Sequence, residues 1–424
     1  MKIKHLTRNF VSFLIAFSMI FAMAVPILTT VVSAADANVI EIRTAEELLQ
    51  VMSDWKKEGW KQSENYQGKT IKLMNDIDLN PGWSAASTIT PLGADSTADD
   101  PAGYQVTFPE APDNKWVPMI GFKGTFDGQG HTIKGLYVNY LSDSKISRFT
   151  EDTIDCYAGF VGRNFGSIKN VVFQNGFIAL RYKQNTGNHK IGSVAGLCKP
   201  SSSIENVYSD MELWAGNKNG WNNIGGIAGR FECGNSDTPA PFSIRNCVFA
   251  GKIGSLDGGA TNVGPSSIGT YVGGIVGSGA NITESKAACT VSIQNCLSVG
   301  VFLQRAENGT IKSNTEKIGT QLNKATLTNN LTEMKDAAYL TTTAGSAYAT
   351  DWEYNATLGY VAPKTLNGFS LPGNVKNILD YDGSERAGTT FTVSDAASLL
   401  HAAKLSQEGV GFNGQVLKLT ADID

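Results

Sequence analysis

One histidine and one carboxylate in a glycine-rich turn have the spacing for acid–base chemistry. His131 follows Asp127 by four residues in the segment F-D-G-Q-G-H. A positioned pair of this kind could move a proton. We favour a structural role, in which Asp127 and His131 hydrogen-bond the turn that contains them. The chain has no G-x-S-x-G nucleophile elbow, so no catalytic residue is assigned.

Two further carboxylates share one side of a predicted strand. Asp76 and Asp78 alternate with Ile77 and Leu79, and alternate residues of a strand face the same way. Such a pair could serve glycoside hydrolysis or bind calcium, but we favour a solvated strand face. With no C-x-x-C pair and no D-x-D-x-D-G loop, neither a metal nor a cofactor is predicted.

Two tryptophans are the candidates for binding. Trp214 and Trp221 flank a Gly/Asn-rich segment, and their rings could stack on sugars. Core packing is the alternative for aromatic residues of this kind.

Six cysteines are spread over the middle of the chain. We expect Cys247 and Cys296 to be small buried hydrophobes, because they take the place of Val171 and Val207 in the repeat described next. Equivalent residues in stacked strands lie ~4.8 Å apart, within the range that a disulfide accepts, so a bridge between them stays open.

These candidates are set in a phrase, I-x-N-[VC], that occurs four times. Its isoleucines are separated by 36, 40 and 49 residues, and a glycine-bounded apolar block precedes each one. A recurring phrase with drifting spacing indicates a stacked supersecondary unit. We expect the isoleucines to form one inward row and the asparagines a ladder at a corner. The copies begin at Ile168, Ile204, Ile244 and Ile293.

The first 34 residues are typical of a signal peptide. A basic start precedes an almost wholly apolar run, Phe10 to Leu28, and Val32-Ser33-Ala34 offers a cleavage site. We therefore expect an exported, secreted or cell-surface chain that begins at Ala35 and has no membrane span. A net charge of −4 argues against nucleic acid as a partner.

Capping patterns appear twice. Thr44-Ala45-Glu46-Glu47 is a capping box that predicts a helix to about Lys57. Residues 391–424 echo this helix and the strand at 70–79. We expect a unit at 35–370, a linker at 371–390 and, at 391–424, the truncated start of a second unit whose chain continues into further repeats or a cell-wall anchor.

The repeats resemble the GLUG family of bacterial cell-surface proteins. The segment F-D-G-Q-G-H and the D-I-D-L at 76–79 are similar to the block that accompanies those repeats, and the resemblance covers roughly 40–370. It implies an all-β fold, a right-handed parallel β-helix (a solenoid) with short capping helices.

Three functions are compatible with such an architecture. We favour a non-catalytic module of an adhesin, stalk or matrix scaffold, with host or matrix glycans or proteins as possible partners. The alternatives are a carbohydrate-binding β-helix and a polysaccharide lyase or glycoside hydrolase.

Overall fold

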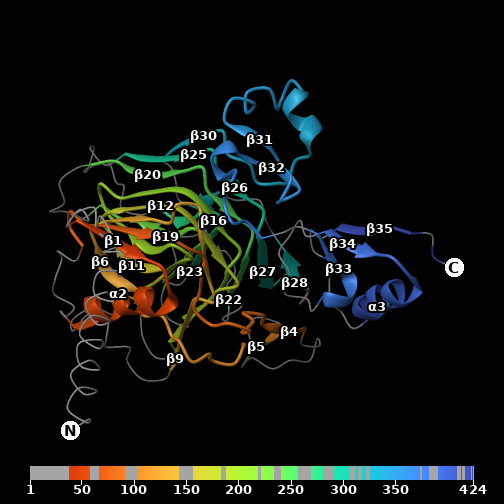
Figure 1. Cartoon of the computed structure of the whole chain (residues 1–424), viewed down its shortest axis with the longest axis horizontal. Helices are drawn as coiled ribbons and strands as arrows, with labels where there is room; N and C mark the ends of the chain where they lie inside the picture. Colours follow the sequence, from red (N-terminus) through yellow and green to blue (C-terminus); the bar gives the residue numbers. More distant parts are fainter. Residues whose placement is uncertain are drawn as a thin grey trace, which may run out of the picture. The chain divides into compact units, whose positions relative to one another are not determined.

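The chain is mostly β-strand and its principal sheets are parallel (Figure 1). The description rests on a computed structural model. It covers residues 38–57, 66–91, 104–142, 156–182, 188–217, 221–233, 240–255, 269–279, 290–305, 311–313, 318–320, 325–372, 375–381, 390–407, 412, 416–421 and 423. The signal-peptide prediction lies outside these residues. No helix in the described ranges is long and apolar enough to cross a membrane.

The longest sheet contains the repeated phrase. Its pairs from β2–β7 to β25–β30 are parallel. The main path is β1 (Val39–Ile42), β2 (Thr70–Leu73), β7 (Thr125–Asp127), β12 (Ser167–Gln174), β16 (Ser203–Ser209), β20 (Phe242–Arg245), β25 (Val291–Gln294) and β30 (Ala325–Thr328). Beside it pair β3 (Ile77–Asp78), β8 (Thr132–Lys134), β21 (Val248–Phe249) and β26 (Leu297–Ser298).

Three further sheets are built from strands that lie, along the chain, between the strands of the longest sheet. The first holds β10 (Cys156–Ala158), β14 (Asn188–Gly192), β18 (Trp221–Gly225) and β23 (Gly269–Gly273). The second holds β6 (Met119–Phe122), β11 (Val161–Asn164), β15 (Ala195–Cys198), β19 (Ala228–Phe231), β24 (Val276–Ser278) and β29 (Gly319–Thr320). The third holds β9 (Tyr137–Ser142), β13 (Phe177–Tyr182), β17 (Glu212–Asn217), β22 (Lys252–Ser255), β27 (Val301–Arg305) and β28 (Ile311–Ser313).

The predicted isoleucine row is confirmed. Ile168, Ile204, Ile244 and Ile293 are direct register partners on neighbouring strands, and all four are fully buried. The pattern missed three members of the row, because their side chains differ or no asparagine follows. These are Ile71 and Phe126 before it and Leu327 after it.

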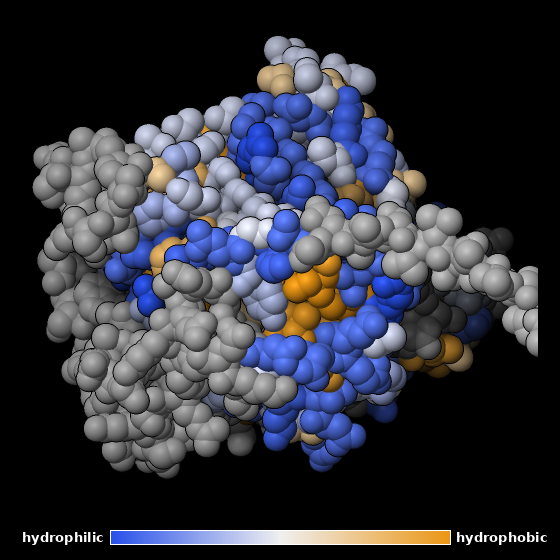
Figure 2. Space-filling model, turned by 60° about the vertical axis from the view of Figure 1, so that its left-hand side comes forward, coloured by the Kyte–Doolittle hydropathy of each residue, from blue (hydrophilic) through white to orange (hydrophobic). Residues whose placement is uncertain are grey.

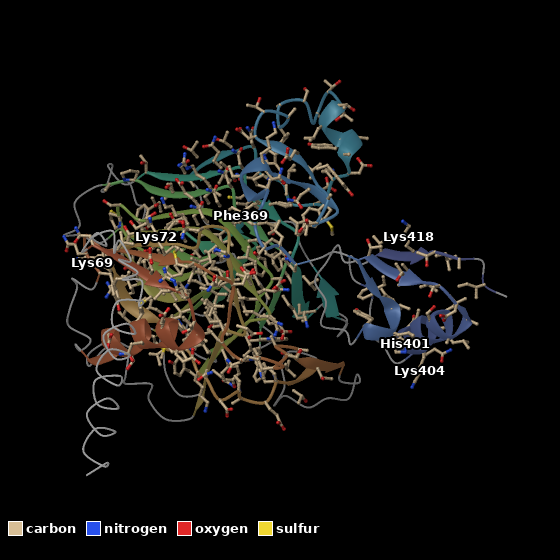
Figure 3. All side chains as sticks on the ribbon, in the orientation of Figure 1. Lys69, Lys72, Phe369, His401, Lys404 and Lys418 are labelled. Atoms are coloured by element: carbon tan, nitrogen blue, oxygen red, sulfur yellow. The ribbon has the colours of Figure 1, made fainter. Side chains whose placement is uncertain are left out.

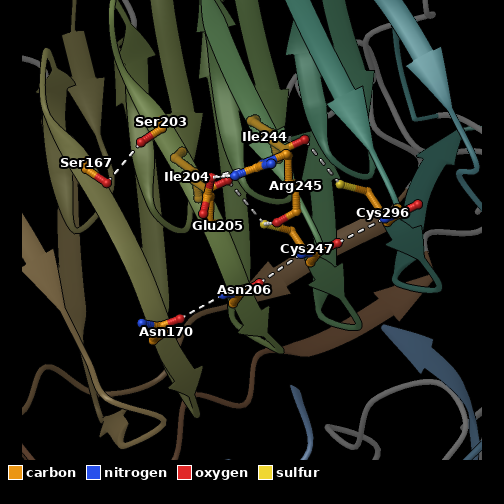
Figure 4. A network of polar contacts seen from close by, with 12 residues as sticks. Ser167, Asn170, Ser203, Ile204, Glu205, Asn206, Ile244, Arg245, Cys247 and Cys296 are labelled. Atoms are coloured by element: carbon orange, nitrogen blue, oxygen red, sulfur yellow. Dashed lines mark hydrogen bonds and ion pairs between the residues drawn. The ribbon is translucent and has the colours of Figure 1, made fainter. Parts of the chain in front are cut away.

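The predicted asparagine ladder is also present (Figure 4). Asn170, Asn206, Asn246 and Asn295 all have left-handed backbones, with φ of 53–54°. Each later Nδ2 donates to the Oδ1 of the asparagine before it, at 2.8, 3.0 and 3.2 Å. Asparagine tolerates the left-handed region better than most residues, so it can turn the strand at the same place in every repeat.

The capping box forms as predicted. Helix α2 (Ala45–Lys57) begins after Thr44, whose Oγ1 accepts from the Glu47 amide at 3.2 Å, while Glu47 Oε2 accepts from the Thr44 amide at 3.3 Å. Leu48 and Val51 of this helix join the core cluster that contains Ile71 and Leu73.

The outward face of the longest sheet is covered by a hairpin. On β12, Val171 and Phe173 enter the main core, whereas Val172 packs on the other face. There it shares a cluster with Trp352 and Tyr360. These belong to the antiparallel pair β31 (Trp352–Asn355) and β32 (Tyr360–Pro363), flanked by the 3-10 turns η1 (Ala337–Thr341) and η2 (Lys364–Leu366).

On the face drawn in Figure 2, hydrophilic side chains predominate around a small apolar patch.

The C-terminal residues have a hydrophobic cluster of their own. A parallel sheet of β33 (Val375–Asn377), β34 (Thr390–Val393) and β35 (Val416–Leu419) packs with α3 (Ala396–Gln407) and η3 (Ile378–Asp380). The segment predicted as a linker, 371–390, thus contains a strand and a turn. Its Ile378 is fully buried, because it supplies part of this cluster.

A carboxylate in the buried row should destabilise the fold strongly. We expect Ile204→Asp to lower the free energy of unfolding by roughly 3–5 kcal/mol, since it buries an unpaired charge. Ile204→Val should cost only about 0.5–1.5 kcal/mol. Denaturant unfolding measures both, and an Asp variant as stable as the Val variant would contradict the buried row.

The asparagine corner can be tested by separating backbone from side chain. Asn246→Gly should lose about 1–2 kcal/mol, because the ladder bonds on both sides disappear. Asn246→Ala should lose a further ~1 kcal/mol or more, because alanine is strained at this φ. Equal losses in thermal unfolding would show that the left-handed corner is not the constraint.

Candidate functional site

The candidate acid–base residues lie in a turn network beside β3. His131 Nδ1 lies 3.1 Å from Oδ1 of Asp76, not against Asp127. The same Asp76 oxygen accepts from the Thr132 amide at 2.9 Å. Sequence spacing missed this pair because its members are 55 residues apart. Asp76 is thereby committed to the backbone that follows the turn.

Asp127 has a different set of partners. Its Oδ1 accepts from the Gln129 amide at 3.1 Å and from Asn170 Nδ2 at 2.9 Å, and Lys169 Nζ lies 3.6 Å from Oδ2. Asp127 therefore closes its own turn and ends the asparagine ladder. This agrees with the structural role that we favoured for Asp127.

The two carboxylates of the predicted pair serve separate purposes. Asp78 Oδ1 accepts from the Asn80 amide at 3.1 Å, and Oδ2 lies 3.6 Å from Lys134 Nζ. Asp76, as described above, binds the turn at Thr132. Each carboxylate is held by its own neighbours. Among the described residues, no group of three or more His, Cys, Asp or Glu side chains could hold a metal ion.

Trp214 is fully buried, which corrects its assignment as a sugar contact. It lies on the outward face of β17, where its ring packs edge-on against Phe108, with centroids 5.8 Å apart. Its register partner is Gly254, where a Cβ would approach the indole to 2.1 Å. A ring enclosed in this way has no face left for a sugar. The backbone of Trp221 lies in β18, and its side chain is outside the described part.

The cover over Trp214 comes from a long loop early in the chain. That loop contains the hairpin of β4 (Thr88–Pro91) and β5 (Tyr104–Thr107). It brings Trp83 and Phe108 onto the outward face of the sheet. The alternation of β17 predicts that Trp214 faces outward, but it carries no information about a loop more than a hundred residues earlier.

A buried ion pair under the same loop was not predicted. Glu212 and Lys252 are register partners, with Nζ 2.6 Å from Oε1. The amide and hydroxyl of Ser87 donate to Oε2 at 3.0 and 2.7 Å. The sequence contained one signal for this pair, because Glu212 and Lys252 have opposite charges and occupy equivalent positions in successive repeats. The pair anchors the loop to the sheet.

A group of buried polar side chains, which includes His189, Lys190 and Asn222, lies on the sheet of β10, β14, β18 and β23. His189 Nδ1 lies 3.1 Å from Oδ1 of its register partner Asn222. Lys190 Nζ stands 4.7 Å from the centroid of the Tyr157 ring, and Arg163 also approaches that ring, at 5.5 Å. Such cation–π contacts stabilise buried cations. The group thus links neighbouring strands, as the ladder does on the longest sheet.

The cysteines behave largely as expected. Cys247 and Cys296 are free and buried, which confirms the hydrophobic role. Cys198 is also free and buried, whereas Cys233 is disulfide-bonded. Burial raises the pKa of Cys198 to about 12. Burial, reinforced by the neighbouring Cys296, raises the pKa of Cys247 well above its usual value.

Comparisons with known proteins found no relative. No protein-family model, no curated protein and no solved structure matches the chain.

The buried thiols should resist alkylation in the folded protein. At pH 8.5 we expect iodoacetamide to leave Cys198, Cys247 and Cys296 unmodified, because all three side chains are buried. The raised pKa values of Cys198 and Cys247 add to this protection, since the thiolate is the nucleophile. Denatured protein should be alkylated at all three, as peptide mass spectrometry would show.

Two of these thiols, those of Cys198 and Cys247, make the stability of the fold depend on pH, because burial raises their pKa values. A thiol whose pKa is higher in the folded state stabilises the fold below its unfolded pKa, and this contribution is lost as the pH rises toward the folded value. For Cys198 this window lies between about pH 9 and about pH 12.

In the alkylation experiment, rapid labelling of Cys198, Cys247 or Cys296 in the native state would contradict their enclosure.

Proposed function

We propose that this chain is a non-catalytic, exported module of a bacterial cell-surface protein, built as a right-handed parallel β-helix of the GLUG type. In this proposal it serves as an adhesin, stalk or matrix scaffold. Its partners would be glycans or proteins of a host or matrix.

One observation supports this proposal above all. The isoleucine row continues in register from strand to strand. The asparagines that follow it are joined by side-chain hydrogen bonds from each repeat to the next. Stacked repeats of this kind form extended, rigid supports. A solenoid in which each pass visits four sheets in turn accounts for this pairing.

The candidate catalytic side chains favour the same proposal. Asp76, Asp78 and Asp127 accept hydrogen bonds from backbone amides of their own or adjacent turns. A general base or nucleophile must instead have a reacting atom within reach. The burial of Trp214 removes one of the two predicted sugar contacts.

The first residues support the exported setting. The basic start, the apolar run and the small residues before Ala35 are typical of a signal peptide that is removed on export. A β-helix that encloses its isoleucine row would then be displayed outside the cell, as is expected for a protein of the GLUG family.

Export and catalytic inactivity can be tested on one protein. Expressed with its own leader in a Gram-positive host, the chain should appear in the wall or medium fraction, and N-terminal sequencing should begin at Ala35. The mature protein should release no oligosaccharide from a panel of acidic and neutral polysaccharides, because the candidate carboxylates of Asp76, Asp78 and Asp127 accept hydrogen bonds within turns. Polysaccharide cleavage that disappears in Asp76→Ala or His131→Ala would overturn the proposal, as would a cytoplasmic, unprocessed chain.

A further inference from the structure

The chain contains the same strand–helix–strand unit twice. β1, α2 and β2 form it first, and β34, α3 and β35 form it again. Both helices begin at a side-chain cap. In the second, Asp395 Oδ1 accepts from the Ser398 amide at 2.7 Å, and this bond lowers the pKa of Asp395. The sequences align Ile42–Leu49 with Val393–Leu400, and Ile71 and Leu73 with Leu417 and Leu419.

Equivalent residues of the two units differ sharply in exposure. Ile42 and Val393 are each 2% exposed, so the two strands are equally enclosed at that point. In the first unit Leu48, Ile71 and Leu73 are 0% exposed. Their counterparts in the second unit are not covered: Leu399 is 46%, Leu417 44% and Leu419 63% exposed. Leu417 and Leu419 share one face of β35, because alternate residues of a strand point the same way. Neighbouring exposed apolar side chains of this kind favour an interaction site.

The first unit shows what covers these positions. Strand β7 pairs in parallel with β2 and sets Phe126 directly opposite Ile71. The same register sets Asp127 opposite Lys72. Among the described residues, β35 is the last strand of the sheet in the second unit. Lys418 there takes the place of Lys72, and Figure 3 labels both lysines.

We propose that the edge of β35, with Leu399 of α3, is a docking surface for a parallel β-strand of the β7 type. The occupant carries an aromatic or aliphatic residue opposite Leu417 and a carboxylate opposite Lys418. Its backbone pairs with the edge of β35, as in other cases of strand addition. The apolar residue covers Leu417 and Leu419, and the carboxylate selects the register through the lysine.

A peptide of residues 119–134 contains such a strand and serves as the probe. With a photoreactive group at the position of Phe126, it should bind the mature chain saturably and cross-link to 416–419. Leu417→Asp and Leu419→Asp should each weaken binding about tenfold or more, because an apolar contact is lost. Both side chains are exposed, so the variants should keep the circular dichroism of the parent. Leu327→Asp, an equally exposed leucine on β30, is the matched control and should bind normally.

A charge exchange tests the register. A peptide with Asp127→Lys should bind the parent chain less tightly, and Lys418→Asp in the protein should restore it. Three results would overturn the proposal: no saturable binding, cross-links or sensitivity at β30 instead of β35, and a dimer that Leu417→Asp abolishes in a chain that captures no peptide. The last result would assign the surface to a second copy.

Discussion

The structure depends on a left-handed backbone corner that occurs at the same place in successive passes of the chain. At Asn170, Asn206, Asn246 and Asn295 the backbone has φ of 53–54°. A shift of one residue in a strand would carry its whole apolar set to the other face. The amide-to-amide bonds at the corner oppose such a shift, because they join only residues that are in register. The enclosed isoleucine row follows from this alignment.

Segments folded over the outward faces of the sheets enclose Glu212 and Trp214, two residues that could otherwise have contributed to an exposed site. The hairpin of β31 and β32 covers the row that includes Val172, and the loop that contains β4 and β5 covers the row that includes Trp214. Polar groups under such covers must be paired, since burial without a partner is costly. Glu212 meets both Lys252 and Ser87 for this reason. The carboxylate of Glu212 thus attaches the loop to the sheet through Ser87.

The sequence predicts those features that repeat and those that are local. The isoleucine row, the asparagine corner and the Thr44–Glu47 box could be predicted from the sequence, because each depends on the spacing of residues within a short segment or from one repeat to the next. Phe126 and Leu327 were missed because the residue type changes toward the ends of the series: a phenylalanine takes the buried position on β7 and a half-exposed leucine the matching position on β30. The His131–Asp76 contact and the enclosure of Trp214 depend on segments far apart in the chain. Alternation predicts which face a residue occupies, but it cannot predict which insertion folds over that face.

The asparagine ladder also has a polarity. All its amide N–H groups point toward Asp127, so their dipoles add along the stack, and hydrogen bonds in such chains strengthen one another. The carboxylate of Asp127 accepts at the positive end, much as an acidic residue neutralises the start of a helix. At the other end, the buried Oδ1 of Asn295 has no hydrogen-bond partner in the described part of the chain. The ladder therefore has a direction: the carboxylate of Asp127 neutralises its positive end, and its negative end is the buried Oδ1 of Asn295 on the C-terminal side.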